Sequence, residues 1–290
     1  MSLFAILTRG RTGSTPLVAE INQHPDIVCH QEIFRPAPPV TSSDMVPAYE
    51  AVRQSGRTPT AEEYLREIEA SAPAGQKVGF KLLMTHLDQH QDIGLERFLF
   101  DSRMPIIFLT RDPARAALSA AIAKERKVFN LPVDLIDDDH RARMKRPVKL
   151  KPSFVAREAR QYAYWNEYWQ NRLRETDTPH IVVTYEEYVE DPLVLLNRIF
   201  RFLDVAELPE LAANPFVKVT SENVWDDVLN AGEVRKALSN HDEGAAPVCK
   251  SDADEARAPQ PSHKAGALEG DKSSTAAERR PWWKSVLPRR

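Results

Sequence analysis

The stretch Leu3-Phe-Ala-Ile-Leu-Thr-Arg-Gly-Arg-Thr-Gly-Ser-Thr-Pro-Leu17 decides the fold of this chain. Residues 3–8 are a short apolar run that ends in a turn signal, which predicts a buried β-strand. Ser14 or Thr15 can cap a helix that starts directly afterwards, and Pro16 suits the first turn of that helix. The chain is therefore expected to begin with a strand, a tight loop and a helix.

The loop at residues 9–13 has the composition of a phosphate-binding turn. It holds Gly10 and Gly13, two of the seven glycines in residues 1–240, and glycine lets backbone N–H groups approach a ligand closely. Amides at the start of a helix bind phosphate, and Arg11 adds a full positive charge. The G-x4-G-K-[ST] spacing of a Walker A loop and its lysine are absent. A capped tight turn with a surface arginine is the alternative interpretation.

Predicted strands and helices alternate through the rest of residues 1–240. The strands are expected at 26–29, 78–83, 105–110 and 181–184, and the helices at 61–72, 88–99, 112–123, 154–173, 192–203 and 223–239. Residues 35–60 and 124–152 have no clear period and are expected to be long, irregular loops. This alternation predicts a single three-layer α/β domain, with a mostly parallel sheet flanked by helices. Ligands of such sheets bind beyond the carboxyl ends of the strands.

The composition excludes several classes of protein. The 290 residues carry a net charge of −3 and are 42% hydrophobic, which argues against a dedicated nucleic-acid binder and against overall disorder. Two cysteines, Cys29 and Cys249, cannot build a disulfide framework and fit a reducing compartment. No stretch has the pattern of a signal peptide or the ~18 apolar residues of a membrane helix. We therefore expect a cytoplasmic protein.

Residues 241–290 differ in composition from the rest of the chain. Val248 and Leu268 are the only large aliphatic residues between positions 241 and 278, so this segment cannot bury enough apolar surface to offset its ordering entropy. We assign residues 1–240 to the folded domain and 241–290 to a disordered tail. The tail ends in a basic, tryptophan-containing sequence, RRPWWKSVLPRR, at 279–290. This end could touch an anionic membrane surface weakly, or it could simply keep the chain soluble.

A second anion-binding signal follows the strand predicted at 105–110. The sequence Thr110-Arg-Asp-Pro113 places Arg111 at the carboxyl end of this strand, and Ser119 lies about two turns into the next helix. An arginine at that position points into the ligand crevice of a parallel sheet. Beside the loop at 9–13, these residues predict a site for a second phosphate. Two adjacent anion sites fit a doubly phosphorylated nucleotide.

With these motifs the sequence resembles the sulfotransferases that use 3′-phosphoadenosine 5′-phosphosulfate (PAPS). In that family an R-x-G-S-T loop after the first strand holds the 5′-phosphosulfate, and a later R-[DN]-P-x5-S segment holds the 3′-phosphate. A third motif, Thr184-Tyr-Glu-Glu187 followed by Asp191-Pro192, is similar to a family segment whose tyrosine lies near the nucleotide base. The residues that the resemblance assigns to the nucleotide are Arg11, Thr12, Gly13, Ser14, Thr15, Arg111, Ser119 and Tyr185.

The resemblance spans residues 3–205 and implies a P-loop NTPase-like domain with PAPS as co-substrate and no metal. The arginine of the first loop resembles the bacterial trehalose-type and Golgi carbohydrate enzymes more than the cytosolic ones. This implies a hydroxyl acceptor on a carbohydrate or glycolipid, and the family likeness favours a homodimer. The R-K-G segment with which the cytosolic enzymes also grip the 3′-phosphate has no match here, and Lys218 is the substitute candidate.

Sulfuryl transfer needs a cation for the leaving phosphate and a base for the acceptor's proton. Arg11 suits the first role because its guanidinium is planar, multidentate and always charged. For the second role we expect Glu32, because Gln31-Glu-Ile-Phe34 matches the Q-E-x-F setting of the base in the trehalose-type enzymes. His30 is the rival base, since its ordinary pKa lies nearer neutrality. Alternation should place His30 and Glu32 on one face.

Other interpretations of the same residues stay open. The chain could be a P-loop-type kinase of nucleotides or small molecules, or a non-catalytic nucleotide-binding relative. Cys29-x5-Arg35 has the spacing of a cysteine-phosphatase loop but contains no glycine. His86 and His90 have the spacing of two zinc ligands on a helix, without an evident third. The many basic side chains in residues 124–152 could form a lid or grip an anionic acceptor.

Overall fold

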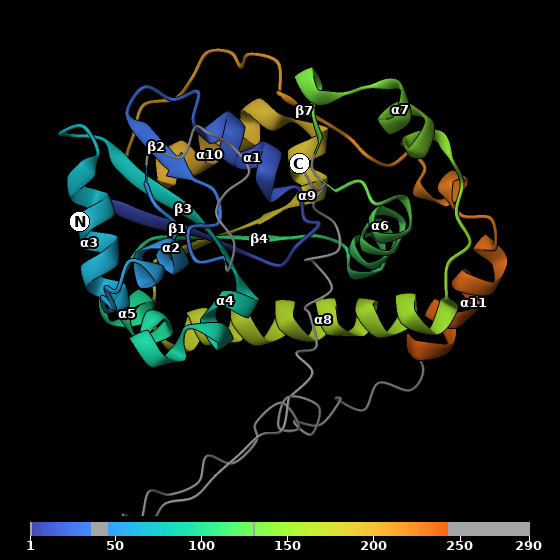
Figure 1. Ribbon diagram of the computed structural model, residues 1–290, viewed down its shortest axis with the longest axis horizontal. Helices are drawn as coiled ribbons and strands as arrows, with labels where there is room; N and C mark the ends of the chain where they lie inside the picture. The colour runs from blue at the N-terminus through green and yellow to red at the C-terminus, as the bar shows by residue number, and fades with distance from the viewer. Residues whose placement is uncertain (1, 36–45, 130, 243–290) are drawn as a thin grey trace, which may run out of the picture. The chain divides into compact units, whose positions relative to one another are not determined.

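The computed structural model describes residues 2–35, 46–129 and 131–242 (Figure 1). A five-stranded parallel sheet forms the centre, in the order β2-β3-β1-β4-β6. Its strands are β1 (Leu3–Thr8), β2 (Ile27–His30), β3 (Lys77–Leu83), β4 (Ile106–Thr110) and β6 (His180–Thr184). Because β1 is the middle strand, the loop that follows it opens at the centre of the sheet's carboxyl edge. The predicted α/β class is confirmed.

Side chains of β1 alternate between two cores, one on each face of the sheet. Leu3, Ala5 and Leu7 join the core beneath α2 (Tyr49–Gln54), α3 (Ala61–Ser71), α4 (Met84–Gln89), α5 (Leu95–Asp101) and the second half of α8 (Pro152–Glu175). Phe4 and Ile6 join the opposite core, with α1 (Ser14–Ile21), α9 (Tyr185–Glu190) and α10 (Pro192–Phe202). Burial of β1 on both faces explains its unbroken apolar sequence. Figure 1 shows these two helical layers on either side of the sheet.

A third core lies beside the sheet and supports one wall of the functional site. It joins α6 (Pro113–Arg126), the first half of α8 and α11 (Ala231–Asp242). A small antiparallel pair, β5 (Leu131–Pro132) with β7 (Phe216–Val217), lies next to it. One further helix, α7 (Asp138–Lys145), and three short 3-10 turns complete the described elements.

Several elements differ from the sequence prediction. The expected loops 35–60 and 124–152 contain the short helices α2 and α7. The helix α7 has no buried residue, and its own charged side chains form ion pairs, such as Asp138 with Arg141. Because no face of this helix is buried, its sequence has no apolar period. The helix expected at 88–99 is two helices, α4 and α5, because Gly94 takes a left-handed φ of 72° between them. The last helix begins eight residues later than expected, at Ala231, and ends at Asp242.

The predicted tail falls almost wholly outside the described residues. The chain divides into a compact unit, Met1–Pro247, and a segment, Val248–Arg290; the latter includes Cys249 and the basic end at 279–290. The disordered tail and its contact with a membrane surface therefore stay predictions. Within the described residues, no helix combines the length and the apolar character that crossing a bilayer requires.

A buried ion pair fastens the segment 219–227 to α6. The Arg126 side chain is 2% exposed and donates to the carbonyls of Arg146 and Val219, at 3.0 and 2.9 Å, and to Asp227 Oδ1 at 2.6 Å. Asp227 also accepts from the backbone N and the hydroxyl of Ser221, both at 2.8 Å. Each of the three guanidinium nitrogens thus donates to an oxygen of the protein, and such hydrogen bonding is the condition under which a buried charge is tolerated.

We expect Asp227→Ala to lower the free energy of unfolding by about 3–5 kcal/mol, because it leaves the Arg126 charge buried without a partner. Urea denaturation of the full chain measures the change. The matched control is Asp138→Ala, which removes the fully exposed partner of Arg141 and should have little effect. Equal losses in the two variants would contradict the assignment of Arg126 and Asp227 as a structural clamp.

Candidate active site

A cavity of about 420 Å³ opens at the carboxyl ends of β1, β3 and β4, where the sequence placed the ligand crevice. Its lining combines the first loop, the start of α1 and α6, helix α9 and the segment 214–220. The polar and charged side chains that line it are Arg11, Ser14, Thr15, Glu20, Glu32, Lys81, Arg111, Ser119, Tyr185, Tyr188, Asn214, Lys218 and Thr220. All the predicted contacts except Thr12 therefore line one cavity.

The first loop turns back on itself through two left-handed residues. Arg11 has φ 68° and Gly13 has φ 81°, and amides in such alternating turns form concave anion-binding nests. The Thr12 side chain points away from the cavity: its hydroxyl donates to the Arg9 carbonyl at 2.9 Å and shares a 2.6 Å hydrogen bond with Thr8 Oγ1. Thr12 therefore fixes the turn and can offer a ligand only its backbone amide.

The absent side chain of Gly13 lets Tyr185 pack directly on the loop. A Cβ atom at this position would lie 2.5 Å from Cδ2 of Tyr185. The guanidinium of Arg111 stacks on the Tyr185 ring, 4.0 Å from its centroid, and Nη1 of Arg111 donates to the Arg11 carbonyl at 2.9 Å. The first loop, the segment after β4 and the start of α9 therefore contact one another directly.

Two half-buried guanidinium groups, of Arg11 and Arg111, give the cavity a positive field. Burial lowers the pKa of Arg11, and the neighbouring charge of Arg111 lowers it further. Burial also lowers the pKa of Arg111. The Nη1 of Arg11 donates to the Phe129 carbonyl at 2.9 Å, whereas Nε of Arg111 has no hydrogen-bond partner among the described residues. Their mutual repulsion is relieved by a bound anion, so the arrangement favours a phosphate ligand.

Helix α8 holds the loop from the opposite side. The Tyr162 hydroxyl donates to the Gly10 carbonyl at 2.7 Å, and the Arg9 guanidinium lies 4.2 Å from the centroid of the same ring. Arg9 also contacts Glu158 at 3.4 Å and Gln161 at 3.0 Å. Arg9 is thus held by α8 and lies outside the cavity lining, which leaves Arg11 and Arg111 as the guanidinium groups that face it.

The predicted base is one member of a polar cluster at the ends of β2 and β3. The Lys81 ammonium lies 2.8 Å from Glu32 Oε1 and donates to the Thr15 hydroxyl at 3.0 Å. His86 Nε2 lies 3.9 Å from the other oxygen of Glu32. The lysine is 3% exposed and lies in a strand that the sequence predicted from its apolar residues. Its charge in the middle of an apolar strand is the sequence signal that marks Lys81. The motifs of the sequence analysis did not include this residue.

Charge and burial decide the protonation states in this cluster. Burial alone would raise the pKa of Glu32, but the charge of Lys81 and its hydrogen bond, helped by His86 and Arg35, lower it overall. Glu32 is therefore an ionised carboxylate at neutral pH. Burial lowers the pKa of His86 to about 4, so this ring is neutral. The rival base His30 is buried, which lowers its pKa, and it does not line the cavity.

Comparison with known proteins assigns the chain. A family model described as a sulfotransferase domain matches residues 4–231. The chain belongs to the sulfotransferase family. A comparison with curated proteins found no match. The expected family and enzyme class are confirmed, whereas the finer likeness to carbohydrate enzymes stays a prediction.

Several solved structures are similar to this chain at low sequence identity and low TM-score. A sulfotransferase from Alicyclobacillus acidocaldarius aligns at 16% identity and a TM-score of 0.43, covering 83% of this chain and 94% of that chain. A sulfotransferase domain from the curacin biosynthetic pathway gives 14% and 0.37, covering 89% and 98%. Retinol dehydratase in complex with retinol and PAP gives 15% and 0.38, covering 84% and 82%.

The phosphatase-like cysteine and the two zinc-spaced histidines of this sulfotransferase have other surroundings than those roles require. Cys29 is buried, which raises the pKa of its thiol, so it lacks the thiolate that a phosphatase nucleophile needs. His90 shares a 2.8 Å hydrogen bond with the Phe34 carbonyl, and His86 lies beside Glu32. In the described part of the chain, no three His, Cys, Asp or Glu side chains gather as a metal site.

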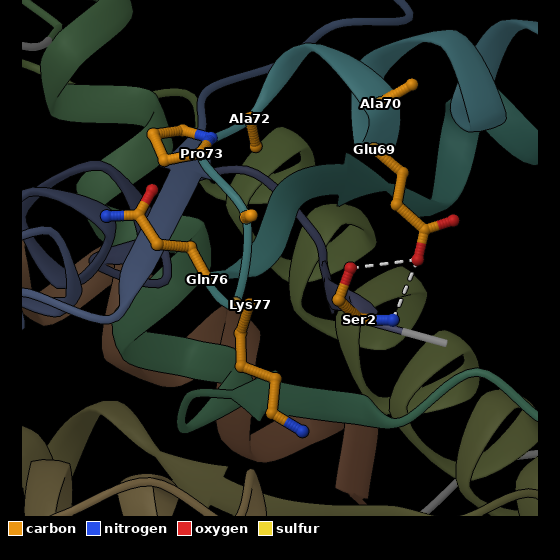
Figure 2. Close-up of a pocket in the computed structure, with 9 residues that line it drawn as sticks. Ser2, Glu69, Ala70, Ala72, Pro73, Gln76 and Lys77 are labelled. Carbon is orange, nitrogen blue, oxygen red and sulfur yellow. Dashed lines mark hydrogen bonds between the residues drawn. The ribbon is translucent and has the colours of Figure 1, made fainter.

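A second hollow of about 540 Å³ lies at the opposite edge of the sheet, where β1 and β3 begin. Figure 2 shows Glu69 accepting hydrogen bonds from the backbone N and hydroxyl of Ser2, at 2.7 and 2.8 Å. Lys77 stands at its rim. This hollow contains none of the predicted site residues, so the chemistry belongs to the carboxyl edge of the sheet.

We expect Gly13→Ala to lower the free energy of unfolding by roughly 1–3 kcal/mol, because it forces a left-handed alanine against the Tyr185 ring. Urea denaturation measures the loss. Gly10→Ala is the matched control, since a Cβ there meets nothing within 4 Å. The double variant Gly13→Ala/Tyr185→Ala should destabilise by less than the two single changes added together, because the clash is gone; strict additivity would contradict the packing argument.

Proposed function

We propose that this sulfotransferase transfers the sulfuryl group from PAPS to a hydroxyl of a carbohydrate or glycolipid acceptor. The observation that carries the proposal is the meeting of the left-handed first loop, Arg11 and Arg111 in the cavity that also contains Glu32. The site presents donors for two phosphates on one side and a carboxylate on the other. A bisphosphorylated donor and a neutral hydroxyl acceptor fit this distribution of charge.

Each part of the nucleotide is matched by a group of the chain. The amides of Gly13, Ser14 and Thr15, at the start of α1, suit the 5′-phosphosulfate. Arg111 and Ser119 suit the 3′-phosphate, and Lys218, from the last third of the domain, lines the same cavity. Tyr185 suits a place near the base. PAPS supplies the activated sulfuryl group, and Arg11 would neutralise the charge that develops on the departing phosphate.

Glu32 is the base in this proposal. The acceptor oxygen forms a bond to sulfur, the bond from sulfur to the phosphate oxygen breaks, and the hydroxyl proton passes to the Glu32 carboxylate. Lys81 bridges the base and Thr15 of the phosphate loop, so it positions Glu32 beside the place where sulfur is transferred. A general base must lie near its proton before its pKa matters, and of the two sequence candidates only Glu32 lines the cavity.

Several properties of the reaction partner stay predictions. The segment 124–152 reaches the cavity through Phe129 and Leu131, whereas residues 36–45 of the long segment 35–60 lie outside the described residues. Retinol dehydratase, one of the distant structures, is described in complex with retinol, which makes a small-molecule hydroxyl the other acceptor class.

A cytoplasmic location, a homodimer and the absence of nucleic-acid partners are retained as expectations from the sequence.

The kinase alternative predicts a different ligand from the sulfotransferase proposal, whereas a non-catalytic relative would bind the same nucleotide without turnover. We expect the full chain to bind 3′-phosphoadenosine 5′-phosphate with micromolar affinity in isothermal titration, without a metal. Arg111→Ala should weaken this binding about 10- to 100-fold, since a hydrogen-bonded charge contributes about 1.5–3 kcal/mol. Arg115→Ala, an exposed neighbour on α6 that does not line the cavity, is the control. Binding of ATP that requires Mg²⁺, with none of the bisphosphate, would support a kinase instead.

The pH dependence of turnover tests the base. With Lys81 present the pKa of Glu32 is lowered, so kcat/KM for an accepted hydroxyl should fall only in acid below the ordinary glutamate range. Lys81→Met leaves the raising effect of burial, and the acid limb should move to higher pH. Lys77→Met, at the other end of β3 (Figure 2), should leave the limb in place. A Glu32→Gln variant with unchanged turnover would refute Glu32 as the base.

A further inference from the structure

A second carboxylate in the cavity has no part in the chemistry derived above. Glu20 lies near the end of α1, is 5% exposed and lines the cavity. Asn214 Nδ2 donates to its Oε1 at 2.7 Å, across 194 residues of sequence. Within the described residues, no group makes a well-aligned hydrogen bond to Oε2. A buried carboxylate oxygen without a donor costs free energy, so it marks a place where a ligand donor is wanted.

The surroundings fix the Glu20 carboxylate in one orientation. The amide of Asn214 also donates to the Tyr188 hydroxyl at 3.0 Å and to the Pro16 carbonyl at 3.3 Å. Burial raises the pKa of Tyr188, and the neighbouring charge of Glu20 and a hydrogen bond between the two side chains raise it further. The Asn214 amide and the Tyr188 hydroxyl thus hold Glu20. No Lys, Arg or His of the described residues forms an ion pair with this carboxylate at the end of the cavity.

The position of Glu20 relative to the phosphate loop indicates which part of the nucleotide it meets. Glu20 lies six positions after Ser14 on α1, which is about 9 Å along the helix axis at 1.5 Å per residue. Tyr188 lies one helical turn after Tyr185 on α9, with ring centroids 6.4 Å apart. A negative charge repels phosphate, so this end of the cavity suits the base of the nucleotide and not its phosphates.

We propose that Glu20 Oε2 accepts a hydrogen bond from the exocyclic amino group of the nucleotide base and thereby selects a 6-aminopurine over a 6-oxopurine. The inference rests on the proposed use of an adenine nucleotide and adds a specificity-determining residue to it. A 6-oxopurine turns an oxygen toward the carboxylate, and the two acceptors repel. Because Asn214 occupies Oε1, the carboxylate offers one acceptor, which suits a single amino group better than the two adjacent donors of guanine.

Paired nucleotides test the proposal on the full chain. Isothermal titration compares 3′-phosphoadenosine 5′-phosphate with 3′-phosphoinosine 5′-phosphate. The unmodified protein should prefer the adenine compound about 10-fold or more, the range expected for a hydrogen bond to a charged group. In Glu20→Gln the amide can donate to the inosine oxygen, so the preference should fall toward unity. Glu190→Gln, an exposed carboxylate on α9 that does not line the cavity, should keep the full preference.

A second variant supplies a test that does not depend on changing Glu20. Asn214→Ala frees Oε1, so the carboxylate gains a second acceptor, and 3′-phosphoguanosine 5′-phosphate should gain affinity relative to the adenine compound. Equal binding of adenine and inosine compounds by the unmodified protein overturns the inference, as does a preference that survives in Glu20→Gln. If neither adenine nor inosine bisphosphate binds, the proposed function itself fails, which is a distinct result.

Discussion

The close packing of Tyr185 on Gly13 is the contact on which the geometry of the site depends. Gly13 is left-handed and has no Cβ, so the ring can lie where a side chain would otherwise stand. The ring carries the guanidinium of Arg111, whose Nη1 in turn holds the Arg11 carbonyl. One small residue thus couples the loop after β1 to the strand ends of β4 and β6. The two arginines can face one ligand because these three strands are adjacent in the sheet.

The same coupling brings two like charges close together. The half-buried guanidinium groups are near enough for Arg111 to lower the pKa of Arg11, and Arg11 adopts a left-handed backbone that a non-glycine residue rarely takes. Such strain is characteristic of ligand sites, where a protein keeps a less stable local conformation because ligand binding requires it. A bound polyanion relieves the repulsion and stabilises the fold by mass action. The clamp of Arg126 and Asp227 supplies rigid support beside this strained region.

Local sequence was sufficient for the first loop and insufficient for the cluster around the base. Arg11, Gly13 and Ser14 are neighbours in the chain, so their spacing alone predicted a phosphate turn. Lys81 meets Glu32 only because β2 pairs with β3 in a register that sets His30 against Phe80, and no single sequence states that register. Asn214 reaches Glu20 across a much longer gap, of 194 residues. The helices α2 and α7 were missed for another reason: the first is too short, and the second buries nothing, so neither has an apolar period.

The two carboxylates of the cavity differ in what neutralises them, and this difference gives the site a direction. Glu32 lies beside a buried ammonium, so it stays ionised, which is the state that the proposed base needs. Glu20 is held by the Asn214 amide and the Tyr188 hydroxyl, so its charge is not paired with a cation among the described residues and repels phosphate. The same cavity is lined by Gly13, Ser14, Arg11 and Arg111. In the proposed mode of binding, a molecule with phosphates at its centre and a proton donor at one end takes one orientation, with its transferable group toward Glu32.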